Sequence, residues 1–115
     1  MPEREISLLI EDILEAIVKI RNYTFNMDMA DFLEDNKTQD AVIRNFEIIG
    51  EAVRRLPGSL KKEYKHIEWD FIVGFRNRIA HEYFGVDYEI VWHILTNDLP
   101  RLETQKPIKK YVVYH

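Results

Sequence analysis

The chain has 115 residues, of which 46% are hydrophobic and 31% charged, a balance typical of one soluble globular domain and not of a disordered segment. Its formal net charge of -4 disfavours a broad phosphate-coating surface, so any contact with nucleic acid must be local. The absence of cysteine excludes thiol chemistry and disulfides, and it suits a cytoplasmic protein. No apolar run approaches the roughly 18 residues that a membrane span needs.

The first half of the chain carries apolar patterns typical of amphipathic helices. In residues 3–23, apolar side chains recur every three or four positions, which predicts a long first helix with one buried stripe. A shorter helix is expected near Met27–Leu33. A second long helix is predicted from Asn36 or Thr38, either of which can cap its start, to about Leu56.

Gly50 lies inside the second long helix, where a glycine costs about 1 kcal/mol relative to alanine. We expect it to mark a close approach of two backbones, at a helix crossing or at a dimer seam. Pro57-Gly58 ends the helix, and a short helical turn is expected over residues 59–67.

The next helix is predicted to open at Glu68–Asp70 and to run through an apolar segment into the charged stretch 75–84, FRNRIAHEYF. Gly85 fits a C-terminal cap for this helix. Asp87 can cap a further helix, which Pro100 either ends or kinks.

These elements predict an all-α fold, an up-and-down helical bundle of about four to six helices with short connections. No strand-rich region or internal repeat is visible. We expect one domain over residues 1–105, followed by a basic tail over residues 106–115 that forms a short extended arm.

Arg76, His81 and Tyr83 stand out because cationic and titratable groups are costly beside an apolar run unless they are paired or functional. A histidine exchanges protons near neutral pH, and an arginine offers a planar fork of donors to a phosphate. Asn77 could orient either of them by hydrogen bonding. Such groups suit acid–base cleavage of a phosphodiester, which requires no metal.

A regular helix would not bring the three side chains together. Arg76 and Tyr83 are seven residues apart and nearly eclipsed, whereas His81 lies about 140° round from Arg76. Two arrangements would solve this problem. The helix could loosen near His81, or a second copy of the chain could complete the site across a two-fold axis.

A structural role is the alternative for each residue. Arg76 could pair with a helix carboxylate such as Asp70 or Glu51. His81 could cap a helix end, and Tyr83 could simply pack. The histidines share no zinc-binding spacing, so we expect neither a metal nor a cofactor.

The stretch FRNRIAHEYFGVDYEIVW resembles the signature of the HEPN superfamily, and specifically that of the HepT-like toxins. Their hallmark Arg-x4-His-x-Tyr is matched by Arg76, His81 and Tyr83. The resemblance covers roughly residues 5–103. The flanking sequence that also matches comprises Ile48–Ala52, Trp69, Asn77, Phe84 and Val86-Asp87.

The resemblance implies a homodimer with paired Arg/His groups in an interfacial cleft. It implies a metal-independent endoribonuclease, the toxin of a HEPN/MNT (type VII) toxin–antitoxin system, with Arg76 and His81 as the catalytic pair and Asn77 in support. It also implies a partner, a minimal nucleotidyltransferase antitoxin that transfers AMP to Tyr83. The added bulk and negative charge should block the pocket and repel RNA.

A different class of function stays open, a non-catalytic helical dimer that only binds a nucleotidyltransferase partner or a nucleotide. The presence of both Arg76 and His81 favours the enzyme. Two cationic pairs, Arg54-Arg55 and Lys61-Lys62, could help hold RNA, although ordinary surface charge is the simpler interpretation.

Overall fold

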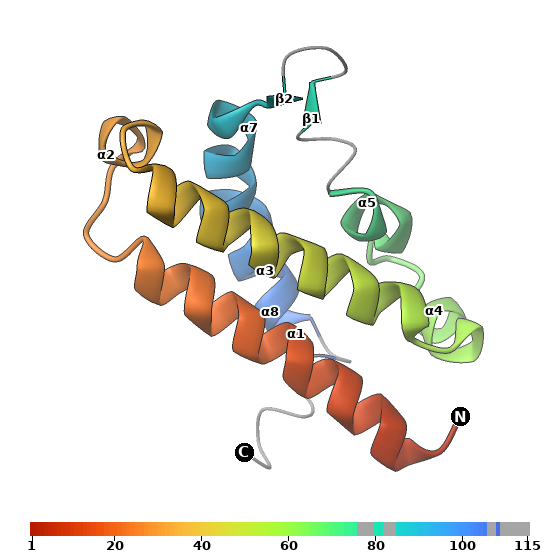
Figure 1. Ribbon diagram of the computed structural model, residues 1–115. Coiled ribbons are helices and arrows are strands. Elements are labelled where there is room, and N and C mark those ends of the chain that lie inside the picture. Colours follow the sequence, from red (N-terminus) through yellow and green to blue (C-terminus); the bar gives the residue numbers. More distant parts are fainter. Residues whose placement is uncertain (76–79, 82–84, 106–107, 109–115) are drawn as a thin grey trace.

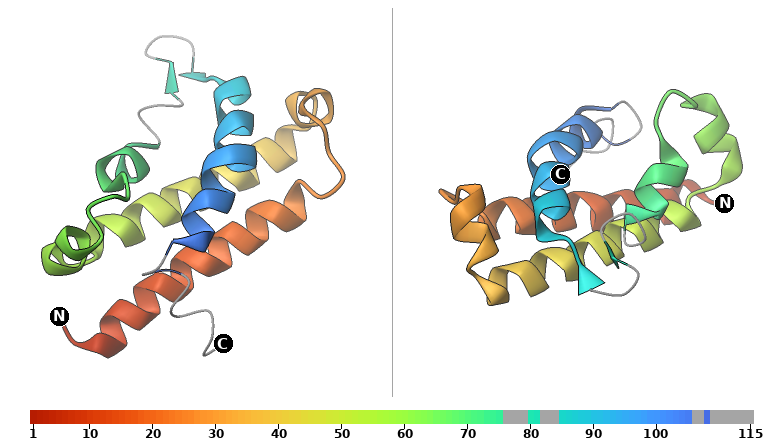
Figure 2. Two further views of the ribbon diagram at one scale, coloured as in Figure 1. Left: turned by 180° about the vertical axis from the view of Figure 1, so that it is seen from behind. Right: turned by 90° about the horizontal axis from the view of Figure 1, so that it is seen from above.

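The computed structural model describes residues 1–75, 80–81, 85–105 and 108. Two long antiparallel helices, α1 and α3, lie side by side and form the base of the molecule (Figure 1). The shorter helices α5, α7 and α8 lie across one face of this pair (Figure 2). The chain is an all-α bundle, as predicted. The strands in its described part are only two residues long each.

Helix α1 spans Glu3–Tyr23, in agreement with the predicted bounds. Glu3 and Glu5 in its first turn favour the positive end of the helix dipole. After the last turn the Thr24 hydroxyl donates to the Ile20 carbonyl over 2.8 Å, satisfying one of the helix's terminal acceptors. The predicted stripe faces the core, and its buried members are Leu9, Ile10, Ile13, Ala16, Ile17 and Ile20.

Helices α2 (Met29–Leu33) and α3 (Asn36–Arg55) follow. The predicted cap of α3 was wrong by one residue, since Asp35 occupies the N-cap and its carboxylate accepts from the Thr38 amide over 3.0 Å. Asn36 and Thr38 are therefore inside the helix. The bond from the Thr38 amide lowers the pKa of Asp35, as expected for a carboxylate that caps a helix in its charged form.

Gly50 marks a helix crossing, one of the two arrangements predicted for it. A Cβ on Gly50 would lie 3.4 Å from the Val73 carbonyl oxygen and 3.6 Å from that of Ile72. Both carbonyls belong to α5, which spans Trp69–Val73. The small residue thus lets the backbones of α3 and α5 come into contact at this point.

Helix α4 (Gly58–Glu63) makes the corner between α3 and α5. The indole nitrogen of Trp69 donates to the carbonyls of Lys61 and Tyr64, each over 3.1 Å. A buried Trp usually finds such a partner for its N–H. These two bonds tie the corner to the first residue of α5.

The prediction of one continuous helix through the charged stretch, capped by Gly85, was wrong at its end. Strand β1 (Ala80–His81) pairs antiparallel with β2 (Gly85–Val86), with His81 opposite Gly85. Because Gly85 pairs with His81 in this ladder, it belongs to the hairpin and not to a helix end, and its φ of +86° is one that a residue with a Cβ rarely adopts. The backbone has left helical geometry at His81, one of the two arrangements considered above.

The C-terminal part consists of α7 (Tyr88–His93), a π-helical turn η1 (Ile94–Asp98) and α8 (Leu99–Thr104). Asp87 caps α7 as predicted, accepting from the amides of the second and third residues after it. Pro100 neither ends the helix that Asp87 caps nor simply kinks it. A proline cannot donate to the carbonyl four residues earlier, and the widened turn η1 precedes it.

Ile108 is fully buried in the core, while the rest of the tail lies outside the described residues, so the extended arm stays a prediction. Within the described part of the chain, no helix has both the length and the apolar character needed to cross a membrane.

The α3–α5 crossing predicts that Gly50→Leu will destabilise the protein by about 1–3 kcal/mol, because the side chain must push the α5 backbone away. Urea denaturation measures this change. Gly58→Leu is the matched control, since no residue in the described part of the chain lies within 4 Å of a Cβ placed at Gly58. Equal stability of the two variants would show that the crossing is not tight.

Candidate active site

Most of the predicted site residues lie in two stretches that the structure does not describe, 76–79 and 82–84. Arg76, Asn77 and Tyr83 lie outside the described residues, and for His81 only the backbone is described. The structure therefore neither brings their side chains together nor separates them. It does define the two segments that lead into and out of the site.

The segment that leads into the site is anchored in the core. Phe75, the residue before Arg76, is 1% exposed and packs against Phe46 of α3 with ring centroids 5.5 Å apart. Its other neighbour is Phe71 of α5, in an edge-to-face contact at 5.3 Å. Edge-to-face and tilted ring pairs stabilise beyond the area they bury. The chain thus enters the motif from a fixed point.

The segment that leads out is a turn of special backbone geometry. His81 pairs with Gly85, and no described residue lies within 4 Å of a Cβ placed on Gly85. The φ of +86° by itself requires glycine here, because a residue with a Cβ rarely adopts that backbone conformation. Gly85 helps to set the direction of the His81 backbone.

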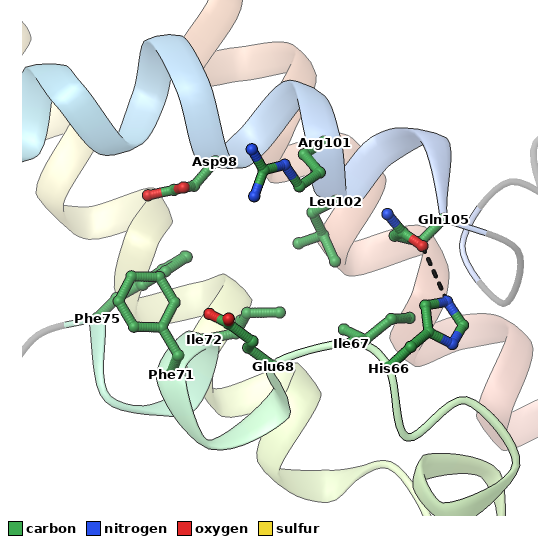
Figure 3. Close-up of a pocket in the computed structure, with 10 residues that line it drawn as sticks. All are labelled: His66, Ile67, Glu68, Phe71, Ile72, Phe75, Asp98, Arg101, Leu102 and Gln105. Carbon is green, nitrogen blue, oxygen red and sulfur yellow. Dashed lines mark hydrogen bonds between the residues drawn. The ribbon is translucent and has the colours of Figure 1, made fainter.

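A cavity of about 110 Å³ lies beside the start of the motif, between α5 and the η1–α8 segment. Figure 3 shows Phe71 and Phe75 on one side, and Asp98 and Arg101 facing them from the other. One end is closed by a hydrogen bond between the His66 ring and the Gln105 side chain, over 3.1 Å. Charged side chains of both signs thus lie opposite the aromatic side of the cavity.

Sequence reasoning had not selected Asp98 or Arg101, which share no motif. Pro100 is the sequence feature that could have pointed to Asp98. A proline two residues later disturbs the hydrogen bonds of the helix in which Asp98 lies. The resulting turn η1 ends at Asp98, one of the residues that line the cavity. π-helical turns occur frequently at functional sites.

Glu51 was one of the carboxylates considered as a partner for Arg76, and in the structure the Arg54 guanidinium donates to both of its oxygens over 3.0 and 2.7 Å. These bonds lower the pKa of Glu51 and raise that of Arg54. Any pairing with Arg76 lies outside the described residues. Among the described residues, no group of three or more acidic, histidine or cysteine side chains is placed to hold a metal ion.

The hairpin geometry predicts that Gly85→Ala will lower the free energy of unfolding by about 1 kcal/mol through backbone strain alone. Gly85→Asn should cost less, because asparagine tolerates positive φ better. Urea denaturation tests the order, with Gly58→Ala as the control. Wild-type stability in the alanine variant would contradict the left-handed conformation at this position.

Comparison with known proteins identifies the family of this chain. The family described as ribonuclease HepT-like matches residues 13–107. A candidate RNase of Methanocaldococcus jannaschii is 41% identical, with 87% of this chain and 83% of the relative covered. A second one from that organism is 39% identical, over 95% of this chain and 92% of the relative.

A candidate ribonuclease HepT of Thermococcus cleftensis is 43% identical, over 82% of this chain and 86% of its own length. No solved structure matches the chain significantly. The family match covers the second half of α1, all of α3 and the whole motif stretch, and these relatives align over most of their own length. The chain belongs to the HepT-like ribonuclease family.

Proposed function

We propose that the protein is a metal-independent endoribonuclease in which Arg76 and His81 are the catalytic pair. The observation that carries the proposal is family membership, because the match over residues 13–107 includes the complete Arg-x4-His-x-Tyr spacing. Relatives named as candidate RNases support the same class of reaction.

The chemistry follows from the residue types. His81 removes the proton of the 2′-hydroxyl, whose oxygen attacks the phosphorus, or it protonates the departing 5′-oxygen. Arg76 donates to the phosphate and offsets the charge that builds up in the transition state. Asn77 orients either partner. The products are a 2′,3′-cyclic phosphate and a free 5′-hydroxyl, so that atoms and protons balance without a metal.

The proposed active species is a homodimer. Two copies of the motif facing each other across a two-fold axis would place two arginines and two histidines around one phosphate. The His81 backbone lies in a strand and not in a helix, so the wheel positions of a continued helix do not apply to it. One histidine can then act as base while the other acts as acid.

The proposed biological role is that of a toxin controlled by a nucleotidyltransferase antitoxin. The antitoxin would join the Tyr83 oxygen to the α-phosphorus of ATP, breaking the bond to the β-phosphate and releasing pyrophosphate and the phenol proton. The attached AMP would place negative charge where RNA must bind. The non-catalytic dimer that binds only a partner or nucleotide is the competing proposal.

His81→Ala is expected to lower the rate of RNA cleavage by about 100-fold or more, because the proton transfer loses its group. Cleavage of a single-stranded RNA by purified protein measures this, with and without EDTA. His93→Ala is the matched control, since that histidine is exposed on α7. EDTA should leave the wild-type rate unchanged.

Equal cleavage by the wild type and His81→Ala, or none by either, would overturn the enzymatic proposal in favour of the binding protein. Sedimentation equilibrium on the same preparations should give about twice 13.8 kDa. An active monomer would contradict the shared site.

Co-expression with the cognate nucleotidyltransferase is expected to add one AMP to the chain, and Tyr83→Phe should abolish the addition because it lacks the accepting oxygen. Intact-mass spectrometry detects the change. Tyr88→Phe is the control, because Tyr88 begins α7 five residues later. Modification that persists in Tyr83→Phe would move the target to another residue.

A further inference from the structure

The corner between α3 and α5 concentrates positive charge in an acidic protein. Residues 54–65, RRLPGSLKKEYK, contain five cationic side chains and one carboxylate. This local charge of +4 stands in a chain of net charge -4, so the other residues together carry -8. The cations, here called the basic corner, are Arg54, Arg55, Lys61, Lys62 and Lys65.

Most of this charge is not neutralised. Arg54 pairs with Glu51, and Lys61 donates to the Arg54 carbonyl over 3.3 Å. Arg55, Lys62 and Lys65 are exposed and form no ion pair with any residue that the structure describes. Grouped like charges repel each other, and they concentrate a positive field that attracts polyanions.

Helix dipoles account for only part of the arrangement. Cations near a helix C-terminus are stabilising, and the last turns of α3 and α4 hold Arg54-Arg55 and Lys61-Lys62. Lys65 lies two residues beyond the last residue of α4, outside its last turn. The corner also offers an aromatic group, since Tyr64 is half-buried with its ring edge-on to His66 at 6.3 Å.

The basic corner is tied to α5, the helix that leads to the motif. The Trp69 indole bonds to the Lys61 and Tyr64 carbonyls, so the first residue of α5 holds the corner. An open hollow of about 460 Å³ between α4 and α5 is lined by Lys61, Lys62 and Lys65. Helix α5 rises roughly 6 Å from Trp69 to its end, and the motif begins three residues later.

We propose that the basic corner binds the phosphate backbone of single-stranded RNA a few nucleotides away from the bond that is cut. This proposal rests on the proposed ribonuclease function. Single-strand sites combine cations that follow the backbone with aromatic rings for the bases, and they span about 4–16 nucleotides. Glu68 and Asp70 line the α5 side of the hollow, so the strand follows the lysine edge of α4.

The test compares Lys62→Gln/Lys65→Gln with Lys19→Gln/Lys37→Gln. Both double variants lose two exposed lysines and reach the same net charge. Lys19 is near the end of α1 and Lys37 at the start of α3, which is the opposite end of the antiparallel pair from α4 (Figure 1). The probe is a fluorescein-labelled single strand of about 16 nucleotides carrying 2′-O-methyl groups, which the enzyme cannot cleave.

Fluorescence anisotropy at several salt concentrations should show weaker binding by Lys62→Gln/Lys65→Gln alone. Loss of two phosphate contacts lowers the slope of log affinity against log salt by roughly 1.4, equivalent to about 25-fold at 0.1 M salt. The control variant should bind like the wild type. Both variants should unfold close to the wild-type urea concentration, because the replaced lysines are exposed and the one ion pair that is lost, Lys19–Glu15, is a surface pair that contributes about 0.3–0.5 kcal/mol.

Wild-type affinity and slope in Lys62→Gln/Lys65→Gln would overturn the docking surface, and so would equal weakening in both variants. If the wild type still cleaved unmodified RNA, the proposed function would survive that result. A wild type that neither binds nor cleaves RNA would overturn both proposals.

Discussion

The contact between α3 and α5 is the constraint on which the position of the motif depends. Gly50 lets the backbones meet, and the carbonyls of Ile72 and Val73 lie directly above it. One turn away on α3, Phe46 packs on Phe75, which immediately precedes the first motif residue. The start of the motif is therefore held by core packing, which is dense and resists displacement.

The two ends of the motif differ in how they are held. The start is held by buried aromatic rings, whereas the end depends on a two-residue hairpin and on the positive φ of Gly85. A short ladder of this kind contributes little stability alone. The packed core fixes where the motif begins, and the hairpin sets the direction in which the chain leaves it. Such a combination suits a site that must be placed accurately and yet admit the proposed polymeric substrate.

Charge distribution presents a related problem. A net-acidic protein repels RNA at long range, so the proposed activity requires attraction concentrated where the strand is to lie. The basic corner would meet this need beside α5, where the bonds from Trp69 hold it. The same tryptophan therefore links the core, the proposed docking surface and the helix that leads to the motif.

Much of this protein was determined by the sequence alone. The apolar period placed α1 over residues 3–23, Asp87 marked the start of α7, and the spacing of Arg76, His81 and Tyr83 indicated the family. These features are local, since helix periods and caps involve residues three or four positions apart. Tertiary structure decided the rest: the partner of Gly50, the hairpin at His81, and the turn that brings Asp98 to the cavity. Most of these depend on contacts between segments distant in sequence, or on the balance between local preference and packing, which a pattern of residues does not record.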